Sequence, residues 1–158
     1  MKALIIYNSK YGNTRQVAEA IGGSVQDAKV VPVDEADLVE LKAYDLLVVG
    51  SPTQAGRPTP AVQKFLAAIP AGSLANTSVA TFDTRITGKN GLVRFFLGLV
   101  GYAAGRIARA LKASGGKLAV PPEGFVVEGK EGPLREGEVE RARNWAAQLS
   151  GSTRAVRG

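Results

Sequence analysis

The sequence predicts an α/β protein built on a doubly wound, five-stranded parallel sheet of order 2-1-3-4-5, in three α/β/α layers. Short apolar runs, typical of strands buried on both faces, alternate with segments of helical periodicity along the chain. Right-handed crossovers between such strands place helices on both faces of the sheet. The length of 158 residues suits one domain, expected over residues 1–150, with a frayed basic tail at residues 151–158.

The first strand is expected at residues 3–7, Ala-Leu-Ile-Ile-Tyr, because the run is apolar without interruption. A polar loop follows, and Thr14 is expected to cap a helix. The apolar residues of that helix recur at helical spacing until the Gly22-Gly23 pair, which predicts its end. A weaker second strand is expected at residues 30–33, despite Pro32.

The middle of the chain contains a strand, a loop and a helix. Residues 34–41 predict a polar connection or a short helix, and residues 44–50 predict the third strand. The loop at residues 51–58 is rich in Pro, Gly and Ser. It leads into a helix from about Thr59, with Pro60 in the first turn, where proline is tolerated.

Residues 78–82 predict the fourth strand, followed by a loop at residues 83–90. The next helix ends near Ser114, and its predicted buried stripe consists of Leu99, Ala103, Ile107, Ala110 and Leu111. Its basic residues Arg106, Arg109 and Lys112 are spaced by three and therefore share another side.

The last strand is expected to be broken. Runs at residues 117–120 and 124–127 flank Pro121-Pro122, and proline cannot donate a hydrogen bond inside a sheet ladder. A bulge between the two runs accommodates the prolines. The closing helix is expected at residues 138–149.

The composition excludes several classes of chemistry. The chain has no Cys and no His, so disulfides, thiolate nucleophiles, Cys/His zinc sites and imidazole bases are all ruled out. The formal charge of +6 raises the question of nucleic acid, but the positive charge is concentrated. Residues 84–122 hold seven basic and no acidic side chains, so one face or end is expected to be positive and no specific nucleic acid is expected. With no signal peptide and no membrane span in the pattern, the expected location is cytoplasmic.

Ligands of doubly wound sheets lie beyond the carboxyl ends of the strands, near the switch point between strands 1 and 3. This rule selects the loops at residues 8–14, 51–58 and 83–91. The first loop, Ser9-Lys10-Tyr11-Gly12-Asn13-Thr14, leads into a helix N-terminus, so its amide groups and hydroxyls converge on a phosphate-sized anion. A Gly-Lys-Ser/Thr triphosphate loop and a three-glycine dinucleotide fingerprint are both absent, which favours a phosphate monoester.

These motifs resemble those of the flavodoxin family, whose members bind flavin mononucleotide (FMN). The family's phosphate loop is matched by Ser9, Gly12 and Thr14, and its second loop by Gly50-Ser51-Pro52-Thr53. The resemblance covers essentially the whole chain and implies a flavodoxin-like fold and FMN as cofactor. The implied FMN-binding residues are Ser9, Lys10, Tyr11, Gly12, Asn13, Thr14, Ser51, Pro52, Thr53, Gln54, Ala55, Gly56, Phe82, Asp83, Thr84 and Arg85.

The resemblance also assigns parts to single loops. The second loop would line the ribityl chain and one edge of the ring, and the loop after strand 4 would bind the pyrimidine side. A peptide beside Gly56 is the candidate to turn over near flavin N5. Flavodoxins usually stack aromatic residues on the ring, but Gln54 and Ala55 stand in the first such place. Aromatic residues from the following segment, such as Tyr102, either reach the ring or pack in the core.

Charge is a second departure from the family, since flavodoxins are typically acidic. Arg57 and Arg85 place positive charge in the second and third loops. A cation about 6 Å from a negative charge contributes roughly 3 kcal/mol at an effective dielectric constant near 20, about 100 mV for one electron. The sequence therefore predicts a less reducing flavin than in acidic flavodoxins.

The leading prediction is an FMN-binding electron-transfer protein in which no side chain acts as a catalytic acid or base and no metal is bound. Its partner is expected to be a redox protein that docks near the flavin edge. An acidic partner would complement the basic surface. The alternative is an FMN-dependent quinone or NAD(P)H oxidoreductase, facing a membrane or quinone through the apolar residues 92–99. A flavin-free interaction protein of the same topology is a third reading.

Overall fold

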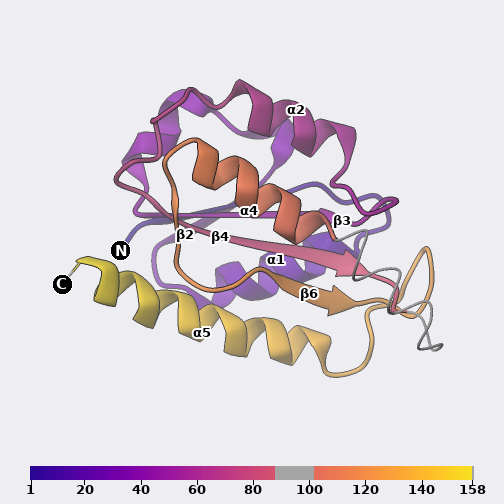
Figure 1. Ribbon diagram of the computed structural model, residues 1–158. Coiled ribbons are helices and arrows are strands. Elements are labelled where there is room, and N and C mark those ends of the chain that lie inside the picture. The colour runs from indigo at the N-terminus through magenta and orange to yellow at the C-terminus, as the bar shows by residue number, and fades with distance from the viewer. Residues whose placement is uncertain (88–101, 158) are drawn as a thin grey trace.

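Six strands form one parallel sheet in the computed structural model, which describes residues 1–87 and 102–157, with side chains as far as residue 151 (Figure 1). The order is β2-β1-β3-β4-β5, and β6 also pairs with β4. The predicted order 2-1-3-4-5 is confirmed. The strands are β1 (Ala3–Tyr7), β2 (Ala28–Pro32), β3 (Leu46–Pro52), β4 (Ser78–Arg85), β5 (Lys117–Leu118) and β6 (Glu123–Val126).

Helices cover both faces of this sheet (Figure 1). Helices α1 (Asn13–Ser24) and α5 (Glu138–Arg157) lie together on one face, whereas α2 (Pro60–Ala68) and α4 (Ala103–Ala113) lie on the other. Two core clusters result because successive side chains of a strand point to opposite faces. One cluster joins Ile5 to residues of α1 and α5, and the other joins Leu4 and Ile6 to residues of α2 and α4.

The start of α1 differs from the prediction. The helix begins at Asn13, after Gly12 with φ 93°, and the Thr14 side chain is buried within the first turn instead of capping it. The helix also continues through Gly22-Gly23 to Ser24. Gly22 is needed for packing, because a Cβ there would lie 2.2 Å from Cγ2 of Val30.

Strand β4 is longer than predicted and includes part of the expected loop at residues 83–90. Asp83 and Thr84 pair with the end of β3, and residues 82–85 pair with β6 on the other side. Because both neighbours continue alongside, β4 remains extended to Arg85. Residues 88–101, including Leu99 and the apolar segment at 92–99, lie outside the described residues.

The interrupted last strand is confirmed. β5 pairs with the beginning of β4 and β6 with its end, so Pro121-Pro122 falls between two separate stretches of ladder. Pro32 ends β2 at the edge of the sheet, and 3₁₀ helices at Val33–Glu35 and Leu38–Ala43 follow. Helix α2 starts close to Thr59, as expected, and the Thr59 side chain caps it by accepting a hydrogen bond from Val62 N–H at 3.4 Å.

Helix α5 runs past Leu149 to Arg157, through the segment expected to be a frayed tail. Its first turn is fixed to β6 by a cluster of charges. The Glu138 carboxylate accepts hydrogen bonds from Val126 N–H and from Arg141, both at 2.7 Å. Arg141 also pairs with Glu123 at 2.9 Å, and its guanidinium lies 4.5 Å from the centre of the Phe125 ring. These contacts join the outer strand to the helix.

We expect Glu138→Gln to flatten the pH dependence of stability. Hydrogen bonding to Arg141 lowers the pKa of Glu138 below its ordinary value of 4.5, against the opposing effect of burial. The folded state therefore favours the ionised carboxylate, and this stabilisation is complete above the ordinary pKa and is lost as the pH falls through the lowered one. Urea unfolding at about pH 7 and about pH 3.5 measures the loss, which should be smaller in the variant than in the wild type.

Glu140→Gln is the matched control, since Glu140 is exposed on the same helix and pairs with Arg143 at 3.1 Å. The control should keep the wild-type pH dependence. If both variants lose the same free energy of unfolding at each pH, the assigned role of Glu138 is wrong.

Candidate cofactor-binding site

A cavity of about 370 Å³ opens at the carboxyl ends of β1, β3, β4 and β6. Its volume falls in the range of small-molecule sites. It lies at the switch point, where β1 and β3 are neighbours but their connections leave in opposite directions. The residues that line it are Ser9, Lys10, Tyr11, Asn13, Thr14, Pro52, Thr53, Gln54, Thr84, Arg85, Ile86, Val127 and Lys130.

The first wall is the turn between β1 and α1. The Ser9 hydroxyl accepts hydrogen bonds from the amide N–H groups of Gly12 at 3.0 Å and Arg15 at 3.4 Å, which curls the turn around it. Within the described part of the chain, the amide N–H groups of Tyr11 and Asn13 have no acceptor. The positive φ of Gly12 produces this curl. The wall therefore offers amide donors at the positive end of α1, which suits an anion.

A hydroxyl pair holds this turn against the sheet. Thr14 Oγ1 and Thr84 Oγ1 lie 2.8 Å apart, and both residues are nearly fully buried. The hydrogen bond connects the first turn of α1 to the end of β4, so it fixes the distance between two walls of the cavity. Each hydroxyl is also satisfied by the other, which avoids the cost of an unpaired buried polar group.

The second wall is a tight turn after β3. Gln54 and Arg57 exchange two backbone hydrogen bonds of 2.8 and 3.0 Å, and the two residues between them, Ala55 and Gly56, have φ of 49° and 78°. Two consecutive positive φ values define a type I′ turn, in which glycine is favoured. Gly56 is buried in this turn, and Arg57 is exposed beyond it.

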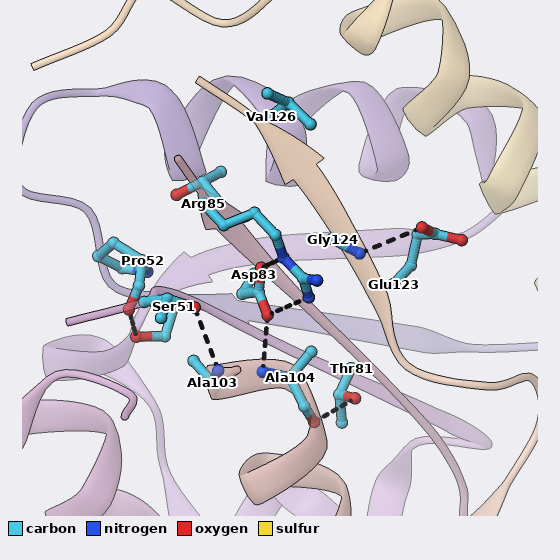
Figure 2. Close-up of polar contacts among 12 residues, drawn as sticks. Ser51, Pro52, Thr81, Asp83, Arg85, Ala103, Ala104, Glu123, Gly124 and Val126 are labelled. Carbon is cyan, nitrogen blue, oxygen red and sulfur yellow. Dashed lines mark hydrogen bonds and ion pairs between the residues drawn. The ribbon is translucent and has the colours of Figure 1, made fainter. Parts of the chain in front are cut away.

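A buried ion pair forms the base of the third wall (Figure 2). Asp83 is fully buried, and its two carboxylate oxygens accept hydrogen bonds from Nε and Nη2 of Arg85, each at 2.7 Å. The Ala104 N–H at the start of α4 donates a further hydrogen bond at 2.9 Å. Burial raises the pKa of the Asp83 carboxyl, while the Arg85 guanidinium and the Thr53 side chain act against that rise.

Neighbouring residues determine the position of the Arg85 guanidinium. It lies 3.5 Å from the centre of the Tyr102 ring, so Tyr102 packs on an arginine instead of facing the cavity. On its other side is Gly124, where a Cβ would come within 2.1 Å of Arg85 Nε (Figure 2). The charge of Arg85 is therefore balanced by Asp83, and its side chain is held by β6 and by the residue before α4.

The loop between β6 and α5 contributes a wall that the sequence analysis did not predict. Val127 and Lys130 line the cavity, and the Glu131 carbonyl accepts a hydrogen bond from Asn13 Nδ2 at 3.2 Å. The predicted parallel sheet contained the signal: β6 is parallel to β4, so the loop after it emerges at the same end of the sheet as the loops after β1, β3 and β4.

Two exposed large hydrophobic side chains line the cavity. Only four large hydrophobic side chains are at least 40% exposed within the described residues, and two of them, Tyr11 and Ile86, line the cavity. The cavity thus combines amide donors at one end with apolar surface nearby.

Ten of the sixteen predicted residues line the cavity. The other six surround it or support it. Gly12 and the Ala55-Gly56 pair shape the two turns, and the Ser51 hydroxyl accepts a hydrogen bond from Thr59 N–H at 2.9 Å. Phe82 packs in the core against Phe125 and Trp145, and Asp83 is the buried partner of Arg85. Arg57 is not among the lining residues.

Comparisons with known proteins identify relatives along the whole chain. The model of a flavodoxin domain family matches residues 4–116. The structure is similar to a flavodoxin from the domain Archaea, with 21% identity and a TM-score of 0.77 over 98% of this chain and 99% of that one. Oxidised flavodoxin 2 from Bacillus cereus has 26% identity and a TM-score of 0.74, covering 96% and 99% of the two chains. No curated protein sequence matches.

A third similar structure is a flavodoxin, WrbA-like protein from Agrobacterium tumefaciens, with 19% identity and a TM-score of 0.74 over 98% of each chain. No helix in the described part of the chain is long and apolar enough to cross a membrane.

We expect Gly12→Ala to destabilise the first wall. An alanine at φ 93° costs about 1–2 kcal/mol, and since no atom lies within 4 Å of the added Cβ, the cost comes from the backbone alone. Urea unfolding should show this loss in the free energy of unfolding.

Gly23→Ala is the matched control, because Gly23 lies in α1 with the same open space and no positive φ. There the substitution should stabilise the protein by about 0.5 kcal/mol. Equal effects of the two substitutions would mean that Gly12 is not required by its backbone conformation.

Proposed function

The chain belongs to the flavodoxin family, and from that premise we propose that it binds FMN at this cavity and carries electrons to a redox partner protein. Proteins of the family bind flavin, typically FMN, and act as electron carriers. The observation that carries the proposal is the cavity itself. Helix-terminal amides lie at one end of it and exposed apolar side chains lie nearby, at the switch point of the sheet.

The residues present fit a flavin phosphate. An FMN phosphate monoester needs hydrogen-bond donors and positive potential, and the β1–α1 turn offers amide N–H groups, the Ser9 hydroxyl and the N-terminus of α1. Lys10 lines the same wall and adds a cation. No acidic side chain is among the described residues that line the cavity. Donors and charge therefore favour a dianion in this place.

The other walls suit the remainder of FMN. Thr53 and Gln54 offer polar groups for a ribityl chain, and Tyr11 and Ile86 offer apolar surface for a ring system. Bound FMN would supply the redox chemistry, because its ring accepts and releases one or two electrons. The protein's own part is to bind and orient the cofactor and to set the charge around it.

We further propose that the bound flavin is less reducing than in acidic flavodoxins, but through different residues from those predicted. Arg85 is neutralised by Asp83, and Arg57 does not line the cavity. The exposed Lys130 lines the cavity from the loop after β6, whereas Lys10 lines it from the β1–α1 turn. Positive charge there favours the reduced, more negative form of a bound flavin.

The partner is proposed to be an acidic redox protein that docks beside this cavity. The exposed Arg57 follows the turn that forms the second wall, and its charge is opposite to that of such a partner. The alternative, an FMN-dependent quinone or NAD(P)H oxidoreductase, requires a substrate to reach the same cavity. Residues 92–99, on which its membrane-facing version depends, are outside the described part.

The purified protein should quench the fluorescence of added FMN with one-to-one stoichiometry. Riboflavin, which lacks the phosphate, should bind at least about tenfold more weakly because the β1–α1 turn then has no anion to hold. Gly12→Ala should weaken FMN binding and leave riboflavin binding nearly unchanged. Equal affinities for FMN and riboflavin, or no quenching, would refute the proposed site, and NAD(P)H-dependent quinone turnover would favour the enzyme over the carrier.

We expect Lys130→Glu to lower the reduction potential of the bound flavin by tens of millivolts, since an exposed charge near the cavity is partly screened by water. A redox titration with reference dyes measures the shift. Lys117→Glu makes the same change of charge at the start of β5. Lys117 pairs with Ser78 at the amino ends of the strands, the end of the sheet opposite the cavity, so the potential should remain unchanged. An equal shift in both variants would attribute the effect to net charge alone.

A further inference from the structure

A second hollow, of about 520 Å³, lies between α2 and α4 on the other side of the second-wall turn. Its apolar lining includes Leu66 and Ile69 from the α2 side and Ala110 and Ala113 from α4. Arg57 and Arg106 also line it. We call it the α2/α4 groove. Small alanine side chains along one helix leave room for larger side chains from outside.

The elements that form this groove contain no carboxylate. Neither α2 nor α4 has an acidic residue, and between residues 46 and 122 the only acidic residue in the sequence is Asp83, which is buried against Arg85. Helix α4 adds the exposed side chains of Arg109 and Lys112 beside Arg106. Positive charge at this groove is therefore not balanced by acidic residues of its own helices.

The opposite face of the sheet shows a different arrangement. There α1 and α5 pack on each other, and each helix carries its own counter-charges. Arg15 pairs with Glu19 at 2.8 Å within α1, and Arg143 pairs with Glu140 at 3.1 Å within α5. Among the described residues, the groove and the exposed basic side chains of Arg57, Arg106, Arg109 and Lys112 lie together on the face formed by α2 and α4.

The groove is adjacent to the proposed flavin site. Pro52, Thr53 and Gln54 line the first cavity, and Arg57 and Pro58, from the same loop, line the groove. The carbonyl of Pro58 is held by Gln63 of α2 at 2.8 Å, so the loop and the groove wall form one piece. A molecule seated in the groove would lie one turn away from the cofactor cavity.

We propose that the α2/α4 groove docks an acidic amphipathic helix of the redox partner protein. Apolar side chains of that helix would enter between Leu66 and Ala110, and its carboxylates would face Arg57 and the basic side of α4. This is the helix-in-groove form of recognition, with charge selecting the partner. The identity of the partner as an electron-transfer protein rests on the proposed function, but the chemistry of the docking segment does not.

An anionic membrane surface is the competing occupant, and the structure favours the helix. Membrane-binding faces project large apolar side chains outward. None of the exposed large hydrophobic residues in the described part of the chain belongs to α2 or α4, where Leu66 and Ile69 are half-buried and buried. The apolar surface here is recessed, and a convex helix fits it better than a flat bilayer does.

The test uses a synthetic 18-residue helical peptide with a stripe of Leu on one side and Glu elsewhere, titrated into the isotope-labelled full chain. Amide chemical shifts should move at residues 63–71 and 106–114. A scrambled peptide of the same composition, which lacks the stripe, should bind about tenfold more weakly. A peptide with Lys in place of Glu should not bind measurably.

Arg57→Glu and Arg106→Glu should each weaken the binding of the acidic peptide by about tenfold, because an attraction becomes a repulsion. Ala110→Leu should weaken it as well by filling the groove without a change of charge. Arg15→Glu on α1 and Arg143→Glu on α5 are the matched controls and should have no effect beyond that of net charge. Thermal melting verifies that each variant is folded.

Equal binding of the stripe and scrambled peptides, shift changes confined to the α1 and α5 face, or sedimentation with anionic phospholipid vesicles without peptide binding would each overturn the proposal. The FMN titration is run separately on the same protein. Peptide binding without FMN binding would support the docking groove and refute the electron carrier. FMN binding without peptide binding would support the FMN site and refute the docking groove.

Discussion

The buried ion pair between Asp83 and Arg85 is the constraint on which the site depends. A carboxylate without solvent is tolerated only where donors surround it, and removal of one partner from such a pair typically costs about 3–5 kcal/mol. The donors here come from β4 itself and from the N-terminus of α4 at Ala104, and Thr53 of the second wall accepts a hydrogen bond from the neighbouring Ala103 N–H at 3.1 Å. These contacts therefore bring together three elements that border the cavity.

The same pair determines how charge acts on a ligand. An arginine inside a binding cavity would ordinarily dominate its potential, but Arg85 forms two hydrogen bonds to a carboxylate and stacks on Tyr102. The Asp83–Arg85 pair, taken together, then carries little net charge at this wall. The exposed Lys130 has no such carboxylate partner within the described part of the chain, so it contributes positive potential at the cavity. The Asp83–Arg85 pair thus holds the wall in place, whereas Lys130 contributes charge. A substitution of Lys130 can therefore change the charge at the cavity without breaking the ion pair.

The sequence predicted the sheet order, the interrupted last strand and residues of three of the cavity walls, because apolar runs, prolines and loop motifs each act locally. It did not predict that β4 continues to Arg85, since that depends on hydrogen bonds to β6, forty residues further along the chain. Thr14 was expected to cap a helix from solvent, whereas its hydroxyl pairs with Thr84. Val127 and Lys130 were missed for the same reason: their place is set by strand pairing at long range and not by a motif.

Several hydrogen bonds hold the turn between the cavity and the groove, which bears on electron transfer. Gln54 and Arg57 exchange two backbone hydrogen bonds, the Ser51 hydroxyl holds Thr59 N–H, and Gln63 holds the Pro58 carbonyl. A partner in the groove and a cofactor in the cavity would therefore lie on two sides of one hydrogen-bonded loop. Docking would then need no loop ordering, so the entropy cost of association falls on the partner's segment alone. A weak, short-lived complex is compatible with transfer under these conditions, because the route between the two sites is formed before the partner arrives.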